Sequence, residues 1–372
     1  MGDPNPDPQG EDLYSRWSAD PLTLAINSVR GEALEAIVAY ALWCARNLHP
    51  EDPSLEKVPQ FLEVAPEVLV VLEKHLDRSV DRSLAIRAVY GERLPALGLL
   101  APQWLRDNMS LIFPPEEEQR ELREAAWGAY VIFNPPYDSV FAVARDEYAA
   151  AVERLGQPSA SRWMTGDPEK RLAEHLVQLF ARSRIDLEDP LLTGFFEEAA
   201  VSVRAAAIRD VGHGLGEITG PPADTVEDRL RDLWVYRLSA ARENAKAEDP
   251  NEELAAFGLW FASGKFDAAW SLECFRETLE LTNGRAASHW GVPKRLSALC
   301  EGYPQETVEC LELAVFGASE AQQVLLLSEP VRVVLATALA SSSDAAKAAA
   351  KRILDEVERR GLRGYEDLVS PP

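Results

Sequence analysis

The 372-residue chain is poor in residues that favour β-strands, with only nine isoleucines and nine threonines. β-Branched side chains lose rotamer freedom in a helix, whereas alanine, leucine, glutamate and arginine lose little. These four helix formers dominate the sequence. The composition therefore predicts an all-α fold.

Cysteine and long apolar runs are also scarce. The four cysteines, at positions 44, 274, 300 and 310, form no CxxC pair and lie among apolar neighbours, which is typical of buried thiols in a reducing compartment. The acidic, proline-rich start lacks the basic and then apolar pattern of a signal peptide. The uncharged stretch Val333–Ala340 is far shorter than the roughly 20 residues that cross a bilayer. We expect a cytoplasmic protein that does not enter membranes.

Positive charge is in short supply, because 38 Lys and Arg face 61 Asp and Glu, giving a formal charge of −23. Binding to nucleic acid or anionic lipid requires clustered cations that release counterions from the polyanion. The cations near the C-terminus, including Lys347 and Arg352, are interspersed with acids such as Asp355. We therefore expect no nucleic-acid partner and no membrane partner, and a preference for basic protein partners.

Motifs that carry catalysis or hold cofactors are missing. The sequence has no HExxH, no GxSxG and no GxxxxGK[ST], and its five histidines are too dispersed for metal-ligand spacing. His175 lies in a charge-rich segment and is predicted to be an ordinary surface or capping residue. We predict no catalytic, cofactor-binding or metal-binding residue, and these absences favour a non-enzyme while leaving an enzyme as the alternative.

Proline and aspartate mark where helices begin, because proline suits the first helical position and an aspartate can accept from free N–H groups. Asp20-Pro21, Asp167-Pro168 and Asp189-Pro190 are such starts. Within the first helical segment, Leu22, Ile26, Val29, Ala33, Ile37, Ala41 and Leu42 keep the spacing of one apolar face. Helices are predicted at roughly 20–48, 60–76, 80–90, 92–99, 102–112, 115–133, 138–155, 168–183, 190–211, 225–244, 251–262, 266–282, 293–301, 304–316, 319–341 and 343–360.

These helices arrive in pairs about every 40 residues, the period of HEAT and armadillo repeats. Short connections make neighbouring helices antiparallel. The pattern predicts an irregular α-solenoid of antiparallel helix pairs, with an irregular helical bundle as the alternative. We expect a polar leader at 1–18, helical regions at 19–155 and 167–372, and seams at 155–166 and 212–224, where Gly, Pro and Ser interrupt the apolar pattern.

One tetrapeptide favours an enzyme instead. Asn134-Pro135-Pro136-Tyr137 spells the NPPY motif of amino-methyltransferases, in which the Asn accepts from the target amino group and the Tyr stacks on the base. That motif follows a strand, whereas the residues before Asn134 have a helical pattern. The glycine-rich run from Gly212 to Gly216 has the same helical context. The two segments are predicted to be a Pro-Pro helix break and a helix C-cap, with an amino-methyltransferase as the alternative.

Aromatic residues crowd both sides of the turn at Ser263-Gly264. Large aromatics anchor protein interfaces, and they also lock packed helices together. The segment is therefore either a partner-docking elbow or an internal helix-helix contact. The candidate docking residues are Trp260, Phe261, Lys265, Phe266 and Trp270.

Three segments of the sequence begin at Asp20 (DPLTLAINSVRGEALEAIVAYALW), Asp189 (DPLLTGFFEEAAVSVRAAAIRDVG) and Trp260 (WFASGKFDAAWSLECFRETLELT). They resemble the C-terminal HEAT-like helical region of large bacterial multidomain proteins, several of them antiphage-defence proteins, whose front end is an NTPase or sirtuin-like module. This chain has no counterpart of that front end. The resemblance implies a region that recognises a protein, such as an NTPase or another defence component, or that mediates assembly.

These observations predict a non-catalytic helical-repeat scaffold or sensor that binds a protein partner in a bacterial defence system. Two alternatives stay open. One is the amino-methyltransferase-like enzyme, and the other is a structural subunit that only oligomerises.

Overall fold

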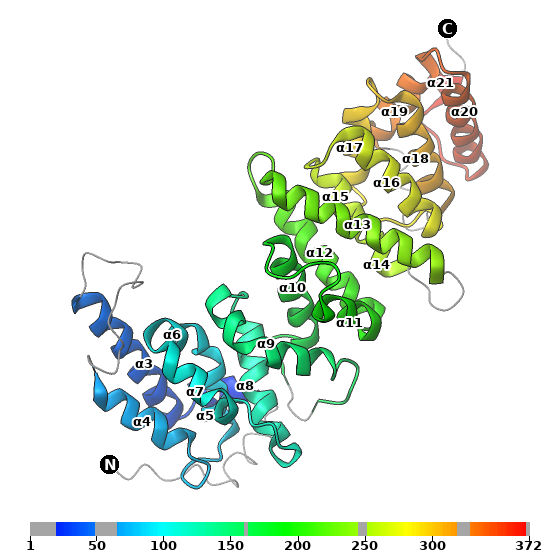
Figure 1. The fold of residues 1–372 in the computed structure, drawn as a ribbon. Helices are drawn as coiled ribbons and strands as arrows, with labels where there is room; N and C mark the ends of the chain where they lie inside the picture. The colour runs from blue at the N-terminus through cyan, green and yellow to red at the C-terminus, as the bar shows by residue number, and fades with distance from the viewer. Residues whose placement is uncertain (1–19, 49–64, 160–162, 245–250, 318–327, 370–372) are drawn as a thin grey trace. The chain divides into compact units, whose positions relative to one another are not determined.

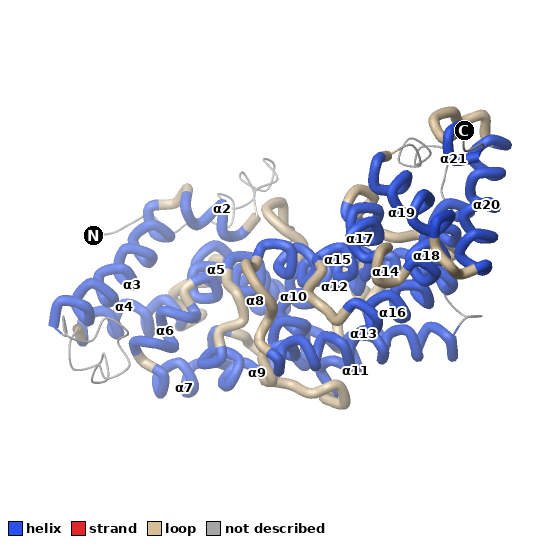
Figure 2. Tube along the Cα trace, turned by 90° about the horizontal axis from the view of Figure 1, so that it is seen from above, coloured by secondary structure: helices blue, strands red, loops and turns tan. Residues whose placement is uncertain are grey.

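The computed structural model consists of helices and connecting segments, with no β-strand in the part of the chain that it describes (Figures 1 and 2). The all-α prediction is confirmed for these residues. The described residues are 20–48, 65–159, 163–244, 251–317 and 328–369. Contacts divide the chain into two compact units: unit 1 is Met1–Leu179 with Glu188–Ala199, and unit 2 is Phe180–Leu187 with Ala200–Pro372.

Helix starts in unit 1 follow the predicted caps. The Asp20 carboxylate accepts from the backbone N–H of Thr23 at 2.8 Å, and Asp189 accepts from that of Leu191 at 3.0 Å. Unit 1 contains α2 (Pro21–Ile26), α3 (Val29–Leu48), α4 (Pro66–Leu76), α5 (Leu84–Glu92), α6 (Leu94–Leu100), α7 (Pro102–Ile112), the 3-10 turn η2 (Glu117–Gln119), α8 (Arg120–Phe133), α9 (Asp138–Val152), α10 (Pro168–Ala181) up to Leu179, and α11 (Pro190–Glu198).

Packing within unit 1 repeats at a step of three helices. α2 packs on α5 and α5 on α8, while α3 packs on α6 and α6 on α9. The α5–α8 contact is close because Gly91 lies against the backbone of Ala126, where an added Cβ would fall 1.9 Å from the carbonyl oxygen. Any larger residue at position 91 would force the two helices apart.

Packing within unit 2 repeats at a step of two. α15, α17 and α19 contact one another in series, and so do α14, α16, α18 and α20. Unit 2 contains α12 (Val201–Glu217), α13 (Asp224–Asn244), α14 (Asn251–Ala255), α15 (Phe257–Ser263), α16 (Ala268–Leu281), α17 (Gly291–Leu299), α18 (Pro304–Gly317), α19 (Glu329–Ala340), α20 (Asp344–Arg359) and the short α21 (Glu366–Val369).

Several predicted boundaries differ from the structure; the helix predicted at 251–262, for example, is divided into α14 and α15. The single helix predicted at 190–211 is two helices, because Ala199 and Ala200 adopt extended backbone between α11 and α12. The predicted C-cap at Gly212 is wrong, since α12 continues to Glu217. At Gly212 an added Cβ would fall 2.6 Å from Cβ of Leu259, so this glycine permits close packing of α12 on α15 rather than ending a helix.

Neither predicted seam coincides with the boundary between the two units. The seam at 155–166 lies inside unit 1 and that at 212–224 inside unit 2, while the contact boundary crosses α10 after Leu179. The predicted leader at 1–18 lies outside the described residues, as do the first residues of the helices predicted at 60–76 and 319–341. All four cysteines are unpaired and buried. In the described ranges, no helix combines the length and apolar character that a membrane span needs.

A buried ion cluster joins three helices of unit 2. The Glu253 carboxylate of α14 accepts from Arg204 of α12 at 2.6 Å and from Arg237 of α13 at 2.5 Å. Glu253 is 1% exposed, so this carboxylate has left water and depends on its two cations. The neighbouring Glu252 forms its ion pair with Arg209 at the surface.

We predict that Glu253→Gln destabilises the protein by about 3–5 kcal/mol, because two largely buried guanidinium groups then lose this negative charge. Glu252→Gln is the matched control and should cost less than about 1 kcal/mol, since its pair is exposed. Urea unfolding followed by tryptophan fluorescence measures both. Equal losses in the two variants would show that burial does not set the strength of this cluster.

Candidate protein-binding surface

Most of the predicted docking residues lie in the core of unit 2. Trp260, Phe261 and Phe266 are 0%, 1% and 5% exposed. The Trp260 indole N–H donates to the carbonyl of Ile208 in α12 at 2.8 Å, and the Phe261 ring stacks on Phe275 of α16 with centroids 4.2 Å apart. These side chains therefore hold helices together, and a partner at the surface does not reach them.

The other two predicted docking residues are half-exposed. Lys265 donates through Nζ to the carbonyls of Ile218 and Gly220, at 2.8 and 2.6 Å. The Arg231 guanidinium lies over the Trp270 ring at 4.5 Å from its centroid, a cation-π contact. Both side chains are engaged within unit 2, so the segment has the features of an internal helix-helix contact.

The NPPY segment ends a helix. Asn134 follows α8, and its side-chain amide donates to the carbonyls of Glu92 and Tyr130, at 3.0 and 3.2 Å. Tyr137 precedes α9 and is 46% exposed. A helix rather than a strand precedes Asn134, so this region lacks the context that the methyltransferase motif requires.

His175 is buried, contrary to the surface position expected for it. It is 2% exposed, and Nε2 lies 2.7 Å from the carbonyl oxygen of Asn134. Because a carbonyl only accepts, Nε2 carries a proton and donates to it, while Nδ1 lies 2.8 Å from the Tyr148 hydroxyl oxygen. The Tyr148 oxygen lies 3.1 Å from that of Tyr130. This network ties α8, α9 and α10 together.

Metal-ligand geometry is absent from the described ranges, where no three His, Cys, Asp or Glu side chains come together to hold an ion. Asp81, for example, is 3% exposed and accepts from Arg30 at 3.0 Å, with His75 Nδ1 at 2.8 Å. Its carboxylate interacts with basic side chains of unit 1 rather than a metal.

Helix α3 has apolar residues on its solvent-facing side. It buries Leu34, Val38, Ala41 and Ala45 against the rest of unit 1. Of the predicted apolar face, Ala41 is therefore buried, whereas Val29 and Ala33 are exposed. Successive residues at helical spacing are exposed on the opposite side. This surface, called the α3 face below, consists of Val29, Ala33, Ala36, Tyr40 and Trp43, together with Val70 of α4.

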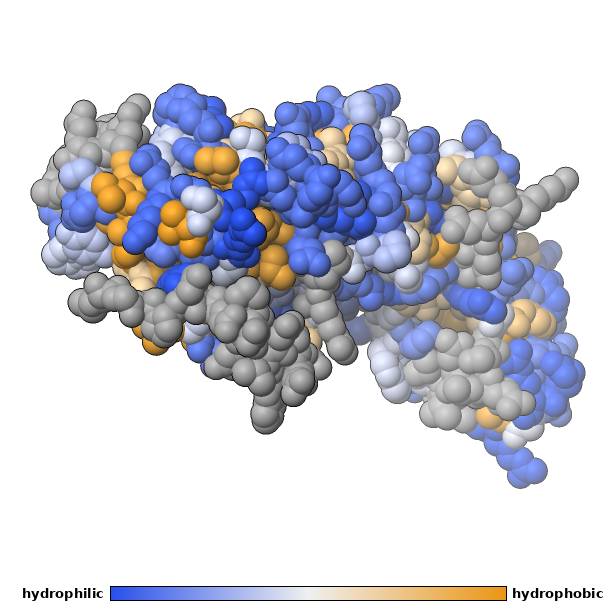
Figure 3. Space-filling view, turned by 90° about the horizontal axis from the view of Figure 1, so that it is seen from below, coloured by the Kyte–Doolittle hydropathy of each residue, from blue (hydrophilic) through white to orange (hydrophobic). Residues whose placement is uncertain are grey.

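Three members of the α3 face are large and highly exposed. Val29 is 76% exposed, Trp43 61% and Val70 66%. The Tyr40 and Trp43 rings stack at 6.4 Å between centroids. A space-filling view also shows hydrophobic residues that reach the surface of unit 1 at several places (Figure 3).

A hydrogen bond positions the aromatic pair against α4. The Tyr40 hydroxyl donates to Glu67 at 3.1 Å, and hydrogen bonding to Cys44 and then to Glu67 raises the pKa of Tyr40 to about 12. The phenol therefore stays protonated at neutral pH and keeps donating. Val70 lies one turn after Glu67 on the same side of α4, which extends the apolar surface onto a second helix.

Charged side chains of both signs border this apolar surface. Glu32 of α3 and Glu67 of α4 are exposed beside it, and so are Arg46 of α3 and Lys74 of α4. An apolar centre with a charged rim is the usual composition of a protein interface. This rim suits a partner whose own charges are arranged to pair with both signs.

Comparisons with known proteins returned nothing, since no family model, no curated protein and no solved structure matches this chain. The resemblance to the helical region of antiphage-defence proteins therefore stays a proposal, as does the identity of any partner.

We predict that Asn134→Ala lowers stability by about 1–3 kcal/mol, because it removes two hydrogen bonds to backbone carbonyls. Tyr137→Phe should change stability by no more than about 0.5 kcal/mol, since this side chain is exposed. Denaturant unfolding measures both. The same samples, titrated with S-adenosylmethionine in a calorimeter, should show no binding heat; saturable binding that Asn134→Ala abolishes would instead support the methyltransferase.

Proposed function

We propose that this chain is a non-catalytic helical-repeat scaffold that binds a protein partner through the α3 face. The stacking pattern supports the scaffold. Contacts that step by three helices in unit 1 and by two in unit 2 are those expected where each repeat packs on the next. A solenoid of this kind offers extended surfaces to a partner.

The exposed aromatic pair on α3 is the observation that carries the proposal. In a helical-repeat protein the outermost helix normally has a polar outer side, because no further repeat covers it. Helix α3 contacts α2, α4, α5 and α6 and exposes Tyr40 and Trp43 on its other side. Burying one such side chain in an interface contributes about 1.5–3 kcal/mol before the costs of association.

The negative net charge of the chain favours one class of partner, a basic protein. The −23 formal charge of the chain favours a partner with an apolar strip and an excess of Lys and Arg around it. Association should be fast at low salt and slower as salt screens the charges. The resemblance noted above suggests an NTPase or another defence component as this partner, while a second copy of the chain would make the protein an oligomerisation subunit.

We predict that Trp43→Ser reduces partner binding more than about tenfold, because exposed tryptophans are common anchors of interfaces. Tagged protein is used to capture partners from host lysate at low salt, with and without phage infection, and light scattering of the purified protein tests self-association. Folding stability should change by no more than about 0.5 kcal/mol.

Trp290→Ser is the matched control for this experiment. Trp290 is 72% exposed and belongs to unit 2, whereas the α3 face belongs to unit 1. The same partner should be captured by wild type and by this control. If the two serine variants lose the partner equally, or if wild type neither captures a partner nor self-associates, the proposed interface is wrong.

A further inference from the structure

A pocket of about 190 Å³ lies in unit 1 where α8, the segment after α9 and the start of α10 meet. Arg120, Glu124 and Trp127 of α8 lie at successive helical turns along one wall. Arg154, which follows α9, and Trp163, which precedes α10, line other sides. The pocket thus combines cationic, anionic and aromatic side chains.

One cation and one acid of the pocket neutralise each other. The Glu124 carboxylate accepts from Arg120 Nε at 2.6 Å and from the Ser159 hydroxyl at 2.8 Å. Arg120 also donates through Nη2 to the carbonyl of Pro158 at 2.6 Å. These groups fix the shape of one wall and leave little net charge there.

The two acids at the start of α10 bind backbone N–H groups. Asp167 accepts from the N–H of Glu169 at 3.0 Å, and the Glu169 carboxylate accepts from the N–H of Gly156 at 2.9 Å. Acids at a helix N-terminus are stabilised by the helix dipole. They line the pocket with two further negative charges.

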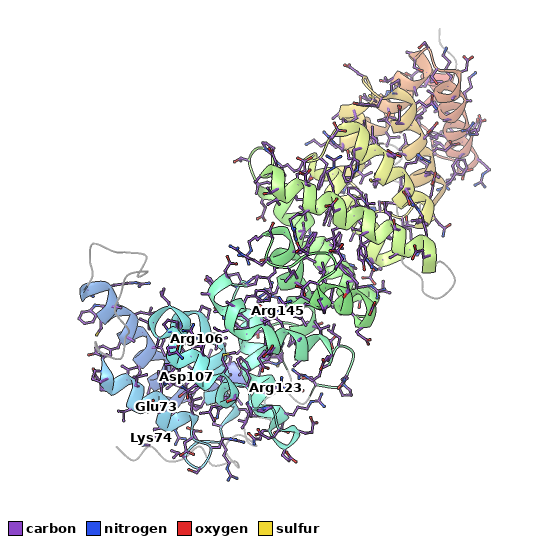
Figure 4. All side chains as sticks on the ribbon, viewed as in Figure 1. Glu73, Lys74, Arg106, Asp107, Arg123 and Arg145 are labelled. Atoms are coloured by element: carbon purple, nitrogen blue, oxygen red, sulfur yellow. The ribbon has the colours of Figure 1, made fainter. Side chains whose placement is uncertain are left out.

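Arg154 is the second cation of the pocket, and it differs from Arg120 in forming no ion pair with a carboxylate of the described residues. It is half-buried, and no described residue forms an ion pair or a side-chain hydrogen bond with it. Burial lowers the pKa of Arg154 and the nearby Arg123 lowers it further, while the charges of Glu147 and Glu124 offset only part of this effect. Arg123, which is labelled in Figure 4, itself pairs with Glu147 at 2.9 Å. Burying half of a cation costs free energy when no anion binds it. The chain has a large excess of carboxylates, yet none of the described ones forms an ion pair with Arg154.

Two tryptophans hold the pocket open. Trp127 is 6% exposed and packs edge-on against Tyr148 with ring centroids 5.0 Å apart. The Trp163 ring lies against Gly128, where an added Cβ would fall 2.3 Å from the ring. Rigid aromatic walls favour flat apolar ligands, because little conformational freedom remains to be lost on binding.

We propose that this pocket binds a small aromatic carboxylate whose carboxylate pairs with Arg154 and whose ring lies against Trp127 and Trp163. The guanidinium group offers a planar fork of donors that matches a carboxylate. A monoanion suits the site better than a phosphate dianion, because Asp167 and Glu169 also line it and repel further negative charge.

The test uses the full chain and three probes of matched shape: benzoate, neutral benzamide and phenyl phosphate. Indole N–H signals in ¹H–¹⁵N spectra report on the pocket, with the Trp163 signal assigned by Trp163→Phe. Benzoate should shift this signal saturably, benzamide should bind at least tenfold more weakly, and phenyl phosphate should also bind more weakly than benzoate. Equal binding of benzamide, or tighter binding of phenyl phosphate, would overturn the proposal.

Variants separate a ligand-binding role of Arg154 from a structural one. Arg154→Gln should abolish the benzoate response and raise the melting temperature of the free protein by roughly 2 °C, because it removes an uncompensated half-buried charge. Arg106→Gln, at an exposed arginine of α7, is the control and should bind benzoate like wild type.

A second variant tests whether benzoate binds in this pocket without changing Arg154. Ala151→Leu extends an apolar side chain at a residue that lines the pocket and should also abolish the benzoate shift. If wild type shows no saturable response, or if Arg154→Gln retains it or lowers the melting temperature, Arg154 has a structural role and the proposal is wrong.

Discussion

Each helix of this protein must bury one apolar face against other helices, and the remaining features of the fold depend on this constraint. Many of the helices are short, and isolated helices of such length are marginal in water. They become stable because each packs on helices two or three positions away along the chain. Glycines such as Gly91 and Gly212 allow close contacts of this kind, and the ion cluster at Glu253 links α12, α13 and α14.

The same constraint is the reason for treating the α3 face as a candidate binding surface. A helix inside the stack has apolar residues on several sides because it has neighbours on several sides. Helix α3 has this composition, yet among the described residues it contacts helices on one side only, which leaves Tyr40 and Trp43 in water. We propose that a partner protein completes the packing that the chain's own helices begin. Arg154 is a comparable case in electrostatics, since the described part of the chain supplies a half-buried cation and no anion bound to it.

Local sequence signals predicted much of the fold. Aspartate and proline mark helix starts such as those at Asp20 and Asp189, because a cap is an interaction between residues close in sequence. The break at Ala199-Ala200 contains no helix-breaking residue, so it depends on tertiary packing and could not be predicted. The glycines of α12 led to the wrong prediction of a helix C-cap, because Gly212 instead permits a tertiary contact with Leu259, far along the chain.

The sites were harder to predict than the helices, because they depend on which face of each helix is covered. His175 and Trp260 share a helical periodicity with their apolar neighbours, and only packing decides that both are buried. The pocket at Arg154 joins segments whose residues have no common motif. The apolar residues on both sides of α3 were a usable signal, but the sequence did not reveal which side faces solvent.

The most direct test of the central claim is site-specific photocrosslinking in the host cell. A photoreactive benzophenone amino acid replaces Trp43 in one variant and Trp290 in another. The account predicts a discrete crosslinked species, with a partner or with a second copy of the chain, from position 43 and none from position 290. The absence of any crosslink at position 43, or the same product from both positions, would contradict it.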